Sequence, residues 1–284
     1  MTIRNLQRTI ASVATSDGAG VKLRRSLGNS QGARVDPFLM LDEFYSDNPG
    51  DYLAGFPSHP HRGFETVTYM LDGHMRHEDN IGNRGDLGPG DVQWMSAARG
   101  IIHSEMPQQT QGRMRGFQLW VNLPAREKMK PASYRDIPAR EIPTLALDGG
   151  GEARVIHGTL RQESGAVDGP ASTRSSASLY ADLHLPPGAH FAAPVDEEST
   201  CLLYLYEGAA TVGDERRALP LNSAGVLGRG DRVGITAGNA GARVLILAGT
   251  PLGEPVVQYG PFVMNTRAEI DQAIADYQSG KLTA

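Results

Sequence analysis

The sequence predicts an all-β protein made of two antiparallel β-barrels in tandem, followed by a short C-terminal helix. Glycine (34 residues) and proline (18 residues) separate short runs of Val, Ile, Leu, Thr and Tyr, which is typical of strands joined by tight turns. Two turn motifs occur twice along the chain and indicate an internal duplication. With 284 residues, of which 40% are hydrophobic and 21% charged, the chain is long enough for two domains with a core each.

The duplication is visible in two pairs of segments. Residues 68–73 (TYMLDG) resemble residues 203–208 (LYLYEG), and residues 87–91 (LGPGD) resemble residues 227–231 (LGRGD). In each copy a strand ends at an acid-glycine turn, and a later Gly-Asp turn begins another strand. One barrel that was duplicated explains both matches.

The individual elements follow from local patterns. Runs of β-branched, aromatic and aliphatic residues, several of them alternating with polar residues, predict strands. These runs are residues 9–13, 38–41, 64–71, 75–78, 91–95, 101–105, 115–122, 154–160 and 200–206. The segment 124–143 is charged and punctuated by proline, which predicts the connection between the domains. We therefore expect an N-terminal domain over residues 1–140 and a C-terminal domain over residues 141–284.

The tail of the chain has the pattern of a helix. Thr266 and Glu269 are spaced as in a capping box. Ile270, Ala273, Ile274 and Tyr277 then form one apolar stripe, and Gly280 suits the end of the helix. We expect this helix to pack on the outside of a barrel.

Composition narrows the classes of partner and compartment. The net charge of −5 argues against nonspecific binding to nucleic acid or to an anionic membrane. The sequence also lacks a run of about 18 apolar residues, which a transmembrane helix would need. The single cysteine, Cys201, excludes an intramolecular disulfide and a thiolate-rich metal site. We therefore expect a cytoplasmic protein that binds neither nucleic acid nor membranes directly.

Two short motifs predict a metal site. His59-Pro60-His61 and His103-Ser104-Glu105 each place two metal-binding side chains at positions i and i+2 of an expected strand, where they face the same way. On adjoining strands they would supply three imidazoles and one carboxylate, a set suited to a first-row divalent metal. In the second copy Pro194 and Asp196 replace the first pair of histidines. Only the N-terminal barrel is therefore expected to hold metal.

The ligand set leaves room for chemistry. Four protein ligands on an octahedral ion leave two positions open for a chelating substrate or for a substrate oxygen beside dioxygen. Glu105 could also act as a general base. Glu65 is the competing acid, because its even spacing from His61 would place it on the same face of a regular strand.

His77 is either a neighbour of the cavity or a surface residue. A further group could line an apolar pocket or belong to the core: Phe56, Met70, Trp94, Met95 and Met106.

These motifs resemble the pirin family, a branch of the cupin superfamily. The matching segments are residues 36–42 (DPFLMLD), 59–69 (HPHRGFETVTY), 90–95 (GDVQWM), 100–107 (GIIHSEMP) and 258–265 (QYGPFVMN). The resemblance implies a bicupin with one mononuclear metal in the N-terminal barrel. It also implies that the metal is usually iron, Fe(II), held by His59, His61, His103 and Glu105. Mn, Co, Ni, Cu and Zn accept the same donors.

The resemblance also implies a choice of functions. Some family members are quercetin 2,3-dioxygenases, which open a flavonol ring with dioxygen and release carbon monoxide. We therefore expect a dioxygenase with an aromatic small-molecule substrate and with Glu105 as its catalytic residue. Eukaryotic members act as transcriptional co-regulators, so the alternative is a metal-dependent binding or regulatory protein with a protein partner and no turnover. A third alternative is a cupin enzyme for an unknown metabolite.

Overall fold

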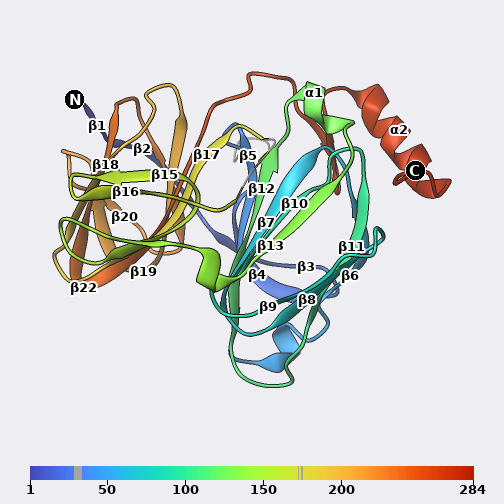
Figure 1. Cartoon of the computed structure of the whole chain (residues 1–284), viewed down its shortest axis with the longest axis horizontal. Helices are drawn as coiled ribbons and strands as arrows, with labels where there is room; N and C mark the ends of the chain where they lie inside the picture. The colour runs from blue at the N-terminus through green and yellow to red at the C-terminus, as the bar shows by residue number, and fades with distance from the viewer. Residues whose placement is uncertain (29–33, 172, 174) are drawn as a thin grey trace.

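The computed structural model describes residues 1–28, 34–171, 173 and 175–284. It consists mainly of β-strands arranged in two halves that lie side by side along the longest axis of the molecule (Figure 1). Within the described part of the chain, none of the helices has the length and apolar character needed to span a bilayer.

The N-terminal half contains two antiparallel sheets that face each other. Its larger sheet has the strand order β13-β10-β7-β12-β5-β4-β3, and its smaller sheet has the order β6-β11-β8-β9. The strands of the larger sheet are β3 (Val13–Asp17), β4 (Val21–Leu27), β5 (Phe38–Ser46), β7 (Phe64–Asp72), β10 (Val92–Ser96), β12 (Met114–Asn122) and β13 (Ser133–Ile137). Those of the smaller sheet are β6 (Phe56–His61), β8 (Met75–Asp79), β9 (Arg84–Leu87) and β11 (Ile101–Pro107).

The C-terminal half is built on one eleven-stranded sheet. Its main path is β14-β15-β17-β22-β19-β21-β2, and β1, β16, β18 and β20 pair beside it. The strands are β1 (Ile3–Arg4), β2 (Leu6–Ala11), β14 (Thr144–Ala146), β15 (Glu152–Gln162), β16 (Gly165–Asp168), β17 (Ala177–Leu185), β18 (His190–Pro194), β19 (Thr200–Val212), β20 (Arg217–Leu219), β21 (Ser223–Leu227) and β22 (Arg232–Gly249). Register shifts after Leu205 and Gly208 of β19 interrupt its pairing with β22, as bulges that bend a strand do.

The predicted all-β architecture with two tandem domains and a C-terminal helix is confirmed, but the closed barrels are not. In the described residues no ladder joins the edge strands β3 and β13 to the smaller sheet, so the N-terminal half is an open sandwich. The physical reason is that side chains of the two sheets pack against each other, as Phe44 and Met70 do with Met75, so the sheets are joined without strand pairing at their edges. The segment 124–143 is more than a connection, because it holds α1 (Ala125–Lys128), the edge strand β13 and a short helical turn at Ala139–Glu141.

The two ends of the chain cross between the halves. Strands β1 and β2 pair with β22 and β21 of the C-terminal sheet. In contrast, β23 (Val257–Tyr259), β24 (Phe262–Met264) and α2 (Arg267–Gln278) lie against the N-terminal half, where Phe262 and Ile270 share a core cluster with Ile102 (Figure 1). Strand pairing and packing thus join segments on both sides of residue 140. The domain boundary at this residue stays a prediction.

The helix at the tail has the predicted cap and face. The Thr266 hydroxyl oxygen accepts a hydrogen bond from the backbone N–H of Glu269, and the Glu269 carboxylate accepts one from the backbone N–H of Thr266. Ile270 and Ala273 are buried, whereas Tyr277 lies at the edge of the stripe and is 43% exposed. The helix is thus fixed by a local cap and by packing on the N-terminal half.

The two halves share a hydrophobic core. One face of the larger N-terminal sheet, which carries Tyr69, Phe117 and Leu119, packs against residues of the C-terminal sheet that include Leu202 and Leu245. Such an interface makes the halves one packed unit rather than two loosely linked domains.

A buried carboxylate links the halves at this interface. Asp182 of β17 is fully buried and accepts hydrogen bonds from the Tyr69 hydroxyl (2.8 Å) and the Tyr206 hydroxyl (2.6 Å). Its Oδ2 atom is also 3.0 Å from His184 Nε2. Tyr69 comes from the N-terminal half, so this cluster joins the two sheets through a polar contact inside an apolar interface.

The cluster predicts a large loss of stability on substitution. Asp182→Ala removes the carboxylate that accepts from two buried hydroxyl groups, and we expect it to lower the free energy of unfolding by about 3 kcal/mol. Urea denaturation followed by circular dichroism measures this change. Asp214→Ala, which removes an exposed acid of the same half, is the matched control with no more than about 0.5 kcal/mol of change. Equal stability of the two variants would contradict the assignment.

Candidate metal centre

Strand pairing brings the two metal-binding motifs together. Strands β6 and β11 are antiparallel neighbours, with His103 opposite His59 and Ile101 opposite His61. The register shifts between His103 and Glu105, which marks an irregularity in the ladder at this point. The prediction that the motifs lie on adjoining strands is confirmed.

Three imidazoles converge at this place. One ring nitrogen each of His59, His61 and His103 lies within 4.8 Å of the other two. The two Nε2 atoms of His59 and His61 are 3.0 Å apart. Two imidazoles bound side by side on one divalent ion, with bonds of about 2.1 Å, have nitrogens about 3 Å apart. The three histidines therefore have a spacing that suits ligands of one ion.

The protonation of the rings also suits a metal. The Nδ1 atom of His59 is 2.8 Å from the Pro57 carbonyl oxygen and must donate to it, which leaves Nε2 as the bare nitrogen. The rings of His61 and His103 are almost fully buried, and burial, followed by the neighbouring imidazoles, holds their pKa well below the usual value. Neutral imidazole is the form that binds metals.

Buried nitrogens without partners point to the same conclusion. Within the described residues, His103 Nε2 and His61 Nδ1 have no hydrogen-bond partner. Such unpaired groups are rare in protein interiors because their desolvation is not compensated. A metal ion at the triad would supply the missing partner of His103. The donor set and its burial thus fit a divalent ion.

Glu105 is buried on the same strand as His103, but its carboxylate does not belong to the cluster formed by the three imidazole nitrogens. Its carboxylate accepts hydrogen bonds from the Thr68 hydroxyl (2.9 Å) and from the Gln118 amide (3.0 Å). The Gln118 carbonyl accepts in turn from the indole of Trp120 (3.2 Å), which turns the amide nitrogen toward Glu105. The role of Glu105 as fourth ligand stays a prediction.

Thr68 and Gln118 are site residues that sequence analysis missed. They come from β7 and β12 of the opposite sheet, so no motif connects them with the histidines. The only signal was alternation along β12, where Gln118, Trp120 and Asn122 stand between apolar residues.

The competing acid, Glu65, lies elsewhere. Its carboxylate accepts a hydrogen bond from the Trp94 indole (2.9 Å) and another from Thr173. The argument from even spacing fails because β6 ends at His61, and β7, which begins at Phe64, belongs to the other sheet.

Among the five pocket candidates only Phe56 lines the cavity described below, whereas Met70, Trp94 and Met95 are buried in the cores and Met106 is not a lining residue.

His77 lies directly behind the triad, which was one of the two alternatives. Its ring is fully buried, stacks on Tyr134 with a centroid distance of 4.8 Å, and places Nδ1 3.2 Å from Nδ1 of His103. Its Nε2 atom is 3.7 Å from a carboxylate oxygen of Asp79. A partner at Nδ1 fixes the orientation of the His103 ring and leaves Nε2 of His103 toward the triad.

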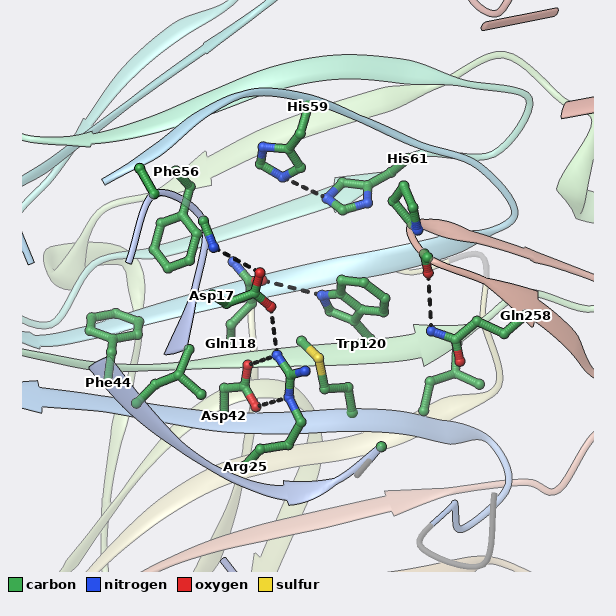
Figure 2. Close-up of a pocket in the computed structure, with 18 of the residues that line it drawn as sticks. Asp17, Arg25, Asp42, Phe44, Phe56, His59, His61, Gln118, Trp120 and Gln258 are labelled. Atoms are coloured by element: carbon green, nitrogen blue, oxygen red, sulfur yellow. Dashed lines mark hydrogen bonds and ion pairs between the residues drawn. The ribbon is translucent and has the colours of Figure 1, made fainter. Parts of the chain in front are cut away.

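A cavity of about 590 Å³ opens beside the histidines. His59 and His61 form part of one wall, and Gln118 and Trp120 lie next to them (Figure 2). The other walls are mainly apolar and include Leu23, Leu39, Met40, Phe44 and Phe56. This volume lies in the range of pockets that bind small molecules.

Comparison with known proteins places the chain in a family. The model of the family described as pirin matches residues 20–121, and the model of the pirin C-terminal cupin domain matches residues 180–283. A pirin-like protein of Caulobacter vibrioides is 50% identical over 281 residues, which cover 99% of this chain and 100% of that protein. The chain belongs to the pirin family.

Other members of the pirin family carry names that refer to an activity. A Pseudomonas aeruginosa protein named "Putative quercetin 2,3-dioxygenase" is 55% identical over 272 residues, which cover 94% of both chains. The crystal structure of a quercetin 2,3-dioxygenase from Acinetobacter baumannii superposes with a TM-score of 0.89 at 34% identity, over 100% of this chain and 99% of that chain. The two domains of the pirin described here are accordingly cupin domains.

In this member of the family the C-terminal segment holds the turns beside the histidine triad. Gly63 and Gly100 have positive φ angles, and a β-carbon at either would collide with a backbone carbonyl, that of Val263 or Leu282. Both glycines stand next to the histidine-bearing strands β6 and β11. The C-terminal backbone therefore packs directly against the turn that follows His61 and the turn that precedes β11.

Two buried cations complete this contact. Arg62 forms an ion pair with Asp276 of α2 (2.7 Å) and donates to the Leu282 carbonyl (3.2 Å) and to the Arg99 carbonyl. Lys128 donates to the carbonyls of Gly63 (2.7 Å) and Val263 (2.9 Å) and to Asn122 (2.7 Å), and burial lowers its pKa to about 8. These bonds fix the backbone on both sides of the His61 turn.

The triad predicts that single histidines are essential for metal. His61→Ala or His103→Ala should abolish stoichiometric metal binding while the β fold persists, because the main cores lie outside the site. Elemental analysis and far-ultraviolet circular dichroism check this result. His190→Ala, which removes an exposed histidine of the other half, is the control. Full metal occupancy in both triad variants would refute the site.

The contact behind His103 predicts a smaller effect. His77→Phe keeps the ring stacked on Tyr134 but removes the nitrogen next to His103, so we expect metal affinity to fall by about 10- to 100-fold. Competition with a chromophoric chelator measures the affinity. His74→Phe, at a largely exposed position before β8, should leave it unchanged. Unchanged affinity in His77→Phe would show that the His103 ring needs no support.

Proposed function

We propose that this protein is an iron-dependent dioxygenase that opens the ring of a flavonol such as quercetin with dioxygen and releases carbon monoxide. The observation that carries the proposal is the cluster of three imidazole nitrogens, of which His59 and His61 also line a cavity with several apolar and aromatic walls. The names of the Pseudomonas and Acinetobacter proteins support the same reaction.

His59, His61, His103 and Glu105 are the proposed ligands. Three neutral imidazoles and one carboxylate leave a divalent ion with a net charge of +1, and they leave two positions of an octahedral ion open. When bound, the ion supplies these positions and redox chemistry toward dioxygen. We propose Fe(II), although Mn, Co, Ni, Cu and Zn accept the same donors. The Glu105 carboxylate now accepts hydrogen bonds from Thr68 and Gln118, and it would have to turn toward the ion to bind it.

The cavity suits a flat aromatic substrate. Phe44, Phe56 and Trp120 offer ring surfaces, and Leu23, Leu39 and Met40 add aliphatic surface. The Trp120 ring is itself fixed, because it contacts Phe64 with a centroid distance of 4.3 Å and donates to Gln118. A fixed aromatic wall would orient a flat substrate beside His59 and His61.

Glu105 is the proposed general base. Thr68 and Gln118 hold its carboxylate in one orientation on the same strand as His103. From this strand it can accept the proton of a flavonol hydroxyl group bound at the triad. Gln118 also lines the cavity, so it connects the substrate space with the base.

The test is anaerobic reconstitution with Fe(II), followed by quercetin and dioxygen. We expect oxygen uptake and carbon monoxide release in equal amounts. Glu105→Gln should retain metal but lose about 10²- to 10⁴-fold in turnover, because an amide can coordinate but is a very poor base. Glu65→Gln is the matched control, since this acid contacts Trp94 and Thr173 instead.

Two outcomes would contradict the proposal. Undiminished cleavage by metal-loaded Glu105→Gln would exclude Glu105 as the base. No carbon monoxide from the iron-loaded wild type would exclude the reaction and favour the alternative, a metal-dependent binding or regulatory protein without turnover.

A further inference from the structure

An ion-paired group of side chains lines the cavity away from the histidines. Arg25 of β4 makes a bidentate contact with Asp42 of β5, through Nε (2.8 Å) and Nη2 (2.7 Å). The same Nη2 atom is 2.7 Å from Asp17, at the end of β3. Figure 2 shows this group, called the acidic wall below: Arg25 and Asp42 lie beyond Gln118 and Trp120 as seen from His59 and His61, and Asp17 lies beside Gln118.

The acidic wall gives the cavity an uneven charge. Apart from the histidines, the ionisable side chains among the described lining residues are Asp17, Arg25 and Asp42, which leaves a net charge of −1 at this side. The other side would carry the positive metal. A ligand therefore meets opposite potentials at its two ends, which favours one orientation.

The acidic wall also has unused capacity to accept hydrogen bonds. An ionised carboxylate has about four lone-pair sites. Asp42 receives two contacts from Arg25, and Asp17 receives one from Arg25 and one from the backbone of Gly18 (2.7 Å). Asp42 is only 3% exposed, and burial raises its pKa to about 6 although Arg25 opposes this shift. Each carboxylate thus accepts fewer hydrogen bonds from the described residues than its oxygen atoms can take.

We propose that Asp17 and Asp42, held by Arg25, determine substrate specificity by binding hydroxyl groups on the end of the substrate remote from its metal-binding oxygens. The substrate class is an aromatic hydroxy-ketone with phenolic hydroxyls at that far end. Neutral hydroxyl donors satisfy the two carboxylates, whereas an anionic substituent meets their repulsion. This inference rests on the proposed function, because it takes the cavity as the flavonol site.

The test measures binding without turnover. The full-length protein loaded with Zn(II) is titrated with 3-hydroxyflavone, which has the chelating group alone, and with quercetin, which adds four hydroxyls. Quenching of tryptophan fluorescence reports binding. We expect wild-type protein to prefer quercetin by tenfold or more, since a hydrogen bond to a charged group has about this effect on an equilibrium constant.

Variants of the acidic wall assign the preference. Asp17→Asn and Asp42→Asn should each reduce it to about threefold or less, mainly by weakening quercetin binding. Asp17 is half exposed, so its variant keeps the test valid even where Asp42→Asn fails to fold. Asp47→Asn, which removes an exposed acid paired with Arg113 outside the cavity, is the control and should keep the full preference.

The outcomes separate this inference from the proposed function. Equal affinity of wild-type protein for the two flavonols, or an undiminished preference in the folded variants, would overturn the role of the acidic wall and leave the flavonol site standing. Failure of both flavonols to bind the zinc-loaded wild type would instead overturn the proposed flavonol chemistry.

Discussion

The contact between the C-terminal segment and the turns beside strands β6 and β11 is the constraint on which the geometry of the histidine triad depends. Burying a cation such as Arg62 or Lys128 costs free energy unless its donors are satisfied. Here Arg62 reaches Asp276 and two carbonyls, and Lys128 reaches two carbonyls and Asn122. Because each cation contacts both a ligand turn and the C-terminal segment, the turn next to His61 cannot move without breaking buried bonds.

This constraint explains how two strands joined to the rest of the fold by turns can hold the histidines in a defined geometry. Strand register sets His59 opposite His103, but register alone does not fix the turn between β6 and β7, where the chain passes from one sheet to the other. Gly63 makes that passage possible with a positive φ angle, and Val263 packs where a side chain would otherwise lie. The histidines are therefore held before any ion arrives, which lowers the cost of binding one.

The two sheets of the N-terminal half contribute different side chains to the candidate site. The smaller sheet carries the three histidines and Glu105, while the larger sheet supplies Thr68, Gln118 and the acidic wall. The opposite face of the larger sheet packs on the C-terminal half, where Tyr69 reaches Asp182. The C-terminal half thus supports the floor of the cavity without contributing a side chain to the triad.

The sequence by itself determined the features that depend on neighbours in the chain. Alternation along strands predicted that His59 and His61 face one way, and the capping box at Thr266 predicted the final helix, because both patterns repeat over a few residues. Only the tertiary structure decided the open sandwich, the contacts of Glu65 with Trp94, the support of Glu105 by Gln118, and the crossing of the chain ends. Each of these rests on which faces of distant strands pack together, and that choice is made by the burial of the whole apolar surface rather than by any local pattern.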